Sequence, residues 1–228
     1  MMIEVKRGEY SYTEGLIKAR ERLLPHLLDI GAIRFGDFRL KLHDQNPEAP
    51  LSPVYIDLRV LQRLPKVKVQ ALDVYQELIQ PLHFDLLAGV PLAATALVSS
   101  LSDRLGIGMI TPRIEEKGYG SGVKVDGLLE SDRGKTAVLI DDVVTTADSK
   151  LKAANVLTDN GIVVRDIVVL IDREQGGREQ LEDVGFHLHC AFTMKEILDF
   201  SVRIGKIDDG VYEDVKRRLE LLNNFLGF

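Results

Sequence analysis

Short apolar runs alternate along the chain with longer stretches in which apolar residues recur at helical spacing. The runs are rich in β-branched residues and end in polar residues or glycine. They predict strands at 85–90, 107–111, 136–142, 163–173 and 187–192. Strands that alternate with helices in this order are typical of βαβ units. The pattern therefore predicts an α/β fold with a parallel sheet of about five strands, flanked by helices.

The helical spacing itself predicts helices at 13–31, 66–82, 149–159 and 208–225. Pro25 interrupts the first of these segments. Because proline lacks a backbone donor and crowds the preceding turn, we expect a break in the helix there. The segment 38–59 contains two short strand-like pieces joined by a polar, proline-bearing loop. We expect this segment to lie outside the main sheet as a hood.

The length of 228 residues is compatible with one large domain. A core of this size buries about three-quarters of the surface that the unfolded chain exposes, so the fold needs no covalent cross-link for stability. The single cysteine, Cys190, has no partner for an internal disulfide and is interpreted as a small buried apolar residue. No repeat, low-complexity tract or linker divides the chain. We expect an N-terminal extension over residues 1–22 and one domain over residues 23–228.

Composition and charge narrow the class of protein further. The chain is 45% hydrophobic and 28% charged, with a mean hydropathy of +0.01, which excludes a disordered protein. Its formal net charge of −6 argues against general nucleic-acid binding, which needs a basic face. The longest uncharged stretch, 86–102, is too short and too often interrupted to span a bilayer. The N-terminus lacks the apolar core of a signal peptide, so we expect a cytoplasmic protein with no membrane partner.

The segment TAVLIDDVVTTADSKLKAANVL (136–157) is the most informative for chemistry. An apolar run ends in two adjacent carboxylates, Asp141 and Asp142, and a loop of small hydroxyl residues then leads into a helix. Ligands of open parallel sheets bind at the carboxyl ends of the strands. A helix N-terminus behind such a loop suits a phosphate group. The alternative is an acidic turn before an ordinary capped helix, and spacing alone does not separate the two.

This segment resembles the ribose-phosphate signature of type I phosphoribosyltransferases. Further segments follow in the order and approximate spacing found in orotate phosphoribosyltransferases: LLPHLLDIGAIRFGDFRLK (23–41), SPVYIDLR (52–59), GVP (89–91), RIEEKGYG (113–120) and LIDREQGG (170–177). The second and last of these separate the orotate enzymes from relatives that use purines or uracil. The resemblance covers residues 23 to 205 and implies a type I phosphoribosyltransferase-like domain, with 38–59 as its hood segment.

The resemblance implies transfer of ribose 5-phosphate from phosphoribosyl pyrophosphate to orotate, giving orotidine 5'-phosphate and pyrophosphate in pyrimidine nucleotide synthesis. Positive charge then develops on the ribose and negative charge on the pyrophosphate, so the site needs carboxylates and cations. By resemblance the catalytic residues are Lys117, Asp141 and Asp142. Mg²⁺ is implied as the cofactor, carried by phosphoribosyl pyrophosphate near the two aspartates without a direct protein ligand. The resemblance also implies a homodimer, in which Lys117 reaches the partner's site.

The resemblance assigns the remaining substrate-binding residues to three groups. The 5-phosphate loop comprises Thr145, Thr146, Ala147, Asp148 and Ser149. The loop 111–122, implied to be mobile, contributes Arg113 and Tyr119 beside Lys117. Orotate is implied to contact Lys41, Tyr55 and Arg173. Each group has a structural alternative: a capped helix, a solvated glycine-rich loop, and, for Arg173, a salt bridge with Asp172 or Glu174.

The sequence departs from the family pattern at three places. Ala147 and Asp148 replace the glycine and the uncharged residue expected in the phosphate loop, and Asp148 could cap the following helix instead of making room for phosphate. Ile114 stands where the family has a basic residue that binds pyrophosphate. About six residues are inserted after Lys41. Two other readings therefore stay open beside the favoured enzyme: a catalytically weakened binding or regulatory protein, and a transferase for another heterocyclic base.

Overall fold

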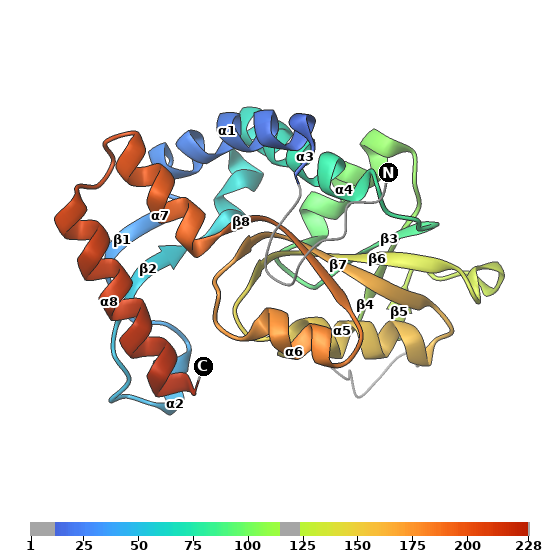
Figure 1. Cartoon of the computed structure of the whole chain (residues 1–228). Helices are drawn as coiled ribbons and strands as arrows, with labels where there is room; N and C mark the ends of the chain where they lie inside the picture. The colour runs from blue at the N-terminus through green and yellow to red at the C-terminus, as the bar shows by residue number, and fades with distance from the viewer. Residues whose placement is uncertain (1–11, 115–123, 228) are drawn as a thin grey trace.

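A six-stranded sheet forms the centre of the molecule, in a computed structural model that describes residues 12–114 and 124–227 (Figure 1). The strand order is β5-β4-β3-β6-β7-β8. Five strands are parallel, as predicted: β3 (Leu86–Gly89), β4 (Met109–Pro112), β6 (Thr136–Val144), β7 (Val163–Asp172) and β8 (His187–Thr193). The two-residue strand β5 (Val125–Asp126) is antiparallel to β4 and too short for a periodic signal.

Helices cover both faces of this sheet. One face carries α1 (Glu14–Asp29), α3 (Pro65–Ile79) and α4 (Thr95–Leu105), and the other carries α5 (Asp148–Asp159) and α6 (Gly177–Asp183) (Figure 1). Side chains of successive strand residues point to opposite faces. Accordingly Val138 and Ile140 of β6 join the core under α3, whereas Leu139 joins the core above α5. The expected α/β fold with helices on both faces is confirmed.

The prediction of a helix break at Pro25 is wrong, because α1 continues through this residue from Glu14 to Asp29. The apolar face of the helix explains the continuity: Leu23, Leu24 and Leu27 are buried against the core. Packing of this face outweighs the loss of one backbone hydrogen bond. The boundary expected after residue 22 falls inside α1, whose Leu16 is buried in the same cluster.

A separate two-stranded antiparallel sheet forms the hood, made of β1 (Ile33–Phe38) and β2 (Ser52–Ile56). The strand β1 ends at Phe38, where the first strand-like piece was expected to begin. A short helix, α2 (Leu42–Gln45), occupies the connection instead. His43 orders it, because its buried ring accepts the Leu40 N–H at 2.9 Å and its Nε2 donates to the Pro50 carbonyl at 3.2 Å.

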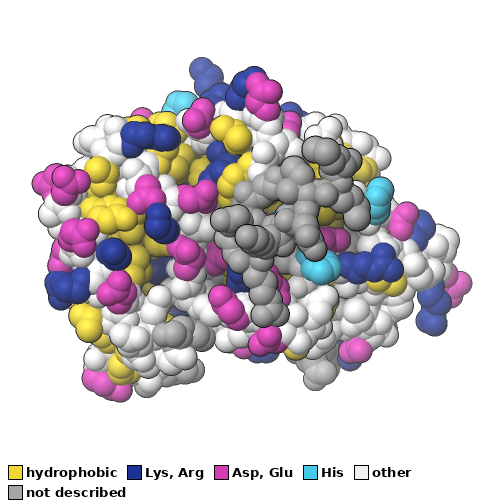
Figure 2. All heavy atoms as spheres, in the orientation of Figure 1, with side chains coloured by type: hydrophobic (Ala, Val, Ile, Leu, Met, Phe, Trp, Pro, Cys, Tyr) yellow, Lys and Arg dark blue, Asp and Glu magenta, His cyan; other side chains and the backbone are white. Residues whose placement is uncertain are grey.

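Two C-terminal helices complete the hood side of the molecule: α7 (Met194–Arg203) and α8 (Asp209–Leu226) (Figure 1). The helix α8 packs against β2, and two 3-10 helices, Leu58–Arg63 and Glu130–Asp132, lie in connecting segments. None of the helices among the described residues is long and apolar enough to cross a membrane. On the face seen in Figure 2, basic and acidic side chains are interspersed, so neither sign dominates that face.

Candidate active site

The carboxyl ends of β6 and β7 bring three of the expected groups together. Val144 is paired with Asp172 across the two strands, and the Arg173 N–H donates to the Val144 carbonyl at 3.0 Å. Because parallel strands end at the same edge of a sheet, the acidic pair, the 5-phosphate loop and Arg173 share this edge. This edge is the candidate active site.

The two carboxylates of the acidic pair lie in different environments. Asp141 is only 4% exposed, and its Oδ1 accepts the Asp142 N–H at 2.9 Å. Asp142 is less buried, and its Oδ1 accepts the Val143 N–H at 2.8 Å. Burial and the neighbouring carboxylate raise the pKa of Asp142 to about 7. The pair therefore carries one tightly enclosed carboxylate and one that titrates near neutral pH.

Lys150 is a residue of this site that the sequence analysis missed. Its side chain is buried, its Nζ lies 2.7 Å from Oδ2 of Asp141, and it donates to the Val143 carbonyl. A signal for its burial was present, because Lys150 precedes Ala153 and Ala154 by three and four residues and therefore shares their helix face. A charged residue on the buried face of a helix needs a partner of opposite charge, which Asp141 provides.

The 5-phosphate loop connects β6 to α5 without backbone strain. Ala147 has φ −77° and ψ −11°, so the substitution of glycine there requires no left-handed conformation. Its N–H donates to Oε1 of Gln180 at 2.8 Å. Asp148 makes no capping hydrogen bond to the helix, contrary to the alternative considered above. Its carboxylate is exposed and accepts the hydroxyl of Thr146 at 3.2 Å.

Two positions of the LIDREQGG segment require glycine, one for its backbone conformation and one for its close contact with this loop. Gly176 has φ +78°, a conformation that favours glycine. Gly177 lies so close to the loop that an added Cβ would stand 2.6 Å from both the Thr145 carbonyl oxygen and Cγ2 of Val144. The start of α6 therefore packs directly against the 5-phosphate loop, and only glycine permits this approach.

Arg173 is a buried guanidinium that forms no ion pair within the described residues. It is 7% exposed, one of its terminal nitrogens donates to Oγ of Ser52 at 3.1 Å, and its buried Nε has no hydrogen-bond partner. Burial lowers the pKa of Arg173 to about 10. The expected alternative of a salt bridge with Asp172 or Glu174 is not found, because both carboxylates are directed to other partners.

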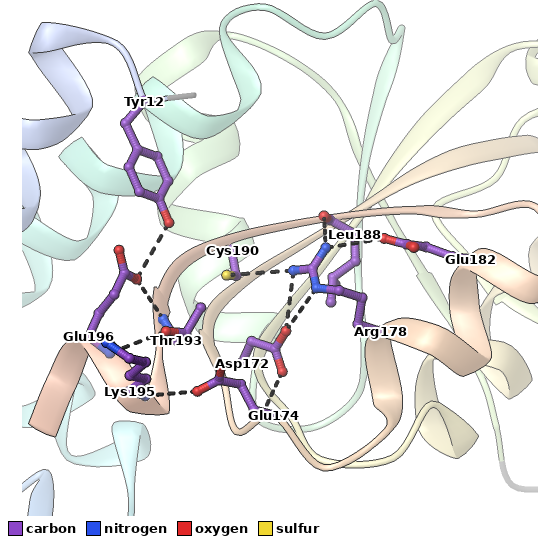
Figure 3. A network of polar contacts seen from close by, with 10 residues as sticks. All are labelled: Tyr12, Asp172, Glu174, Arg178, Glu182, Leu188, Cys190, Thr193, Lys195 and Glu196. Carbon is purple, nitrogen blue, oxygen red and sulfur yellow. Dashed lines mark hydrogen bonds and ion pairs between the residues drawn. The ribbon is translucent and has the colours of Figure 1, made fainter. Parts of the chain in front are cut away.

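Those other partners hold the chain on either side of Arg173 in place (Figure 3). Asp172 accepts two hydrogen bonds of 3.2 Å from Arg178 of α6. Glu174 has a positive φ of 55°, and its carboxylate accepts the Lys195 N–H at the start of α7. Backbone conformations of this kind persist where the surroundings fix them, often at functional sites. The segment thus presents Arg173 from a rigid turn.

The helix α8 holds the same turn from the hood side. The buried Gln175 donates from Nε2 to Oδ1 of Asn223 at 2.9 Å, and Nδ2 of Asn223 donates to the Glu174 carbonyl at 3.3 Å. The apolar spacing over 208–225 predicts this helix but indicates no role for Asn223. Its amide connects the final helix to the turn that carries the guanidinium.

The structure places the two hood residues expected to contact orotate at the start of α2 and on β2. Lys41 is exposed at the start of α2. Tyr55 is half-buried on β2, where its ring packs 5.5 Å from that of Phe38 and under the guanidinium of Arg34 at 4.8 Å. Strand alternation directs Tyr55 away from the face that carries Ser52.

Of the residues assigned to the loop 111–122, Arg113 lies in the described part of the chain. Arg113 forms a two-pronged pair with Asp126 across the base of the loop, and its backbone N–H donates to the Lys124 carbonyl at 2.8 Å. Lys117 and Tyr119 lie outside the described residues. Within the described ranges, no cluster of three or more His, Cys, Asp or Glu side chains could hold a metal ion.

Comparison with known proteins identifies the family. No protein-family model matches the chain. An orotate phosphoribosyltransferase of Methanopyrus kandleri is 36% identical over 182 residues, which cover 80% of this chain and 93% of that protein. The chain belongs to the orotate phosphoribosyltransferase family. A crystal structure of the family member from Aeropyrum pernix agrees with a TM-score of 0.69 at 32% identity, covering 82% of this chain and 99% of that one.

Larger relatives contain the same unit as one part. The uridine 5'-monophosphate synthase of Bos taurus is 34% identical over 200 residues, which cover 87% of this chain but 40% of that protein. The chain thus spans about two fifths of the length of this relative. The family resemblance and the type I phosphoribosyltransferase fold are confirmed over most of the chain.

Proposed function

We propose that this chain transfers ribose 5-phosphate from phosphoribosyl pyrophosphate to orotate, as an enzyme of pyrimidine nucleotide synthesis. The observation that carries this proposal is Arg173, a buried guanidinium that has no carboxylate partner among the described residues and shares its sheet edge with the acidic pair and the 5-phosphate loop. A buried cation is costly unless an anion compensates it. Orotate brings a planar carboxylate, which matches the fork of donors on a guanidinium.

In this proposal the acidic pair stabilises the ribose during the reaction. As the bond to pyrophosphate breaks, positive charge develops on the ribose ring, and fixed negative charge beside it stabilises that state. Asp142 is the less buried of the two carboxylates and stands nearest to solvent. The 5-phosphate is bound by Thr145, Thr146 and Ser149 at the start of α5, where the helix dipole favours an anion.

The leaving pyrophosphate requires cations, which we assign to Arg113 and Lys117. Mg²⁺ bound to phosphoribosyl pyrophosphate, near Asp141 and Asp142, would neutralise further negative charge on the leaving group. We propose a homodimer in which Lys117 of each chain reaches the partner's site. Light scattering at micromolar concentration tests this assembly, and a monomer would contradict it.

One assay tests the proposed reaction directly: release of pyrophosphate from phosphoribosyl pyrophosphate and Mg²⁺, with and without orotate. We expect release that depends on orotate and that is lost in Asp142→Asn. Release stimulated by another heterocyclic base but not by orotate would favour a transferase of different specificity. Binding without release would favour the weakened protein, for which the bond between Asp148 and Thr146 is the supporting observation.

A further inference from the structure

Lys150 is buried at the start of α5, directly after the 5-phosphate loop. All the donors of its ammonium are directed to neighbouring protein groups. The residue is 4% exposed. Its Nζ lies 2.7 Å from Oδ2 of Asp141, donates to the Val143 carbonyl and lies 3.3 Å from Oγ of Ser149. A lysine ammonium has three donors. All three are directed to protein atoms, so Lys150 has none left for a substrate.

The same contacts make Asp141 an inward-facing residue. Its Oδ2 is paired with Lys150, and its Oδ1 accepts the Asp142 N–H at 2.9 Å. The buried hydroxyl of Tyr75 donates to the main-chain carbonyl of Asp141 at 2.8 Å. Asp142 retains a partly exposed carboxylate. The two members of the acidic pair are therefore not equivalent, although they are adjacent in the sequence.

We propose that Lys150 is a positioning residue of the acidic pair, which holds Asp141 turned inward and leaves Asp142 as the carboxylate that faces the ribose. The inference rests on the proposed function and refines it, because the family resemblance implies the same role for both aspartates. Lys150 also joins the end of β6, through Val143, to the start of α5, through Ser149. Its ammonium thereby fixes the two ends of the 5-phosphate loop relative to each other.

The charge environment of Asp142 provides a measurable consequence. Asp141 raises the pKa of Asp142, and Lys150 lowers it. Two further groups face Asp142 from other elements: Arg59 from the 3-10 helix Leu58–Arg63 and Tyr75 from α3. Loss of Lys150 would leave two carboxylates together without their buried cation, so Asp142 would hold its proton up to a higher pH.

Four variants separate this role from ordinary packing: Lys150→Met, Lys150→Arg, Asp141→Asn and the double variant of Asp141→Asn with Lys150→Met. Methionine keeps most of the side-chain volume and removes the charge, whereas arginine keeps the charge. Lys152→Met is the matched control, because Lys152 is an exposed lysine on the same helix. The titration of Asp142 is followed by carboxyl carbon NMR, with Asp142→Asn identifying its signal.

We expect Lys150→Met to raise the titration midpoint of Asp142 by about one pH unit or more. The acidic limb of kcat should move in the same direction, with the KM for orotate unchanged. Lys150→Arg should have the midpoint of the parent protein, because it keeps the charge. The double variant should have a lower midpoint than Lys150→Met, because the like charge of Asp141 is gone. Lys152→Met should leave the midpoint unmoved. An unchanged midpoint in Lys150→Met, or the same upward shift in the double variant, would overturn the proposal.

Activity of the aspartate variants gives an independent test of the division of roles. Asp141→Asn should lower kcat less than tenfold, because the inward residue touches no substrate. Asp142→Asn should lower it more than about a hundredfold. Equal losses would overturn the proposal. If the parent protein shows no orotate-dependent release, the proposed function fails, but the NMR titration still decides the role of Lys150 because it needs no substrate.

Discussion

Arg173 and Ser52, which are 121 positions apart in the sequence, are joined by a 3.1 Å hydrogen bond from the guanidinium to the serine Oγ. The same oxygen donates to the Val54 carbonyl at 2.7 Å, so it is held in place by the hood strand itself. This bond is a direct polar link between the hood and the carboxyl end of β7. It fixes one arm of the guanidinium and leaves the buried Nε for another acceptor.

Replacement of Arg173 should weaken orotate binding selectively. Arg173→Ala removes the bidentate partner of the carboxylate and should cost about 2 kcal/mol or more, roughly a thirtyfold rise in Kd. Arg173→Lys should recover only part of the loss, because an ammonium lacks the planar fork. Calorimetry with orotate measures both. Arg63→Ala, which removes an exposed arginine, is the control. Parent-like orotate affinity in Arg173→Ala would refute the assignment.

Gly177→Ala should disturb the 5-phosphate loop from outside the site. The new methyl group would collide with the Thr145 carbonyl oxygen and with Val144, which cannot both withdraw without moving the loop. We expect a loss of about 1–3 kcal/mol in the free energy of unfolding, together with weaker binding of phosphoribosyl pyrophosphate. Urea unfolding and calorimetry measure the two effects. Gly108→Ala is the control, since its Cβ would make only ordinary contact with Leu86; an equal effect there would contradict the argument.

The central sheet was predictable because its signal is local. Each parallel strand is an apolar run, and both faces of β6 are buried, as Val138 and Leu139 show. The order of the acidic pair, the hydroxyl loop and α5 along the chain also predicted that the acidic pair lies near the end of a strand, and it lies near the end of β6. These features depend on residues that are neighbours in the sequence.

Features that depend on distant partners could not be predicted in this way. The contact of Arg173 with Ser52 and the tie of Gln175 to Asn223 become visible only when the hood and α8 are in place. The continuation of α1 through Pro25 depends likewise on packing against α3. Lys150 is intermediate, because its helix face indicated burial but the position of its partner Asp141 came from the fold.

The stability of the ligand-free protein should fall as the pH rises from about 4 to about 7. Burial and Asp141 raise the pKa of Asp142 to about 7, so in this range the folded state binds more protons than the unfolded state. Stability decreases with pH under that condition, here by up to about 4 kcal/mol. Urea unfolding at a series of pH values measures the slope. Asp142→Asn should reduce the slope without abolishing it, because burial also raises the pKa of Asp172, to about 6. An unchanged slope in that variant would assign the dependence to other groups.

Asp148 should weaken the binding of phosphoribosyl pyrophosphate in two ways. Its exposed carboxylate accepts the Thr146 hydroxyl, a donor that the 5-phosphate would otherwise use. It also places a negative charge beside the anion. At an effective dielectric constant near 20, two unit charges about 6 Å apart repel by roughly 3 kcal/mol, which Mg²⁺ and solvent partly offset. Asp148→Asn and Asp148→Ser should therefore bind phosphoribosyl pyrophosphate about tenfold more tightly.

Calorimetry at low salt distinguishes the charge of Asp148 from the backbone of the loop. Asp159→Asn, at the far end of α5, changes the net charge equally and should have little effect on affinity. Ala147→Gly should give no gain, because Ala147 already adopts a right-handed helical conformation and glycine would only add flexibility to the unfolded chain. If neither Asp148 variant binds more tightly, the loop tolerates the charge, and the interpretation of this chain as a weakened enzyme loses its main support.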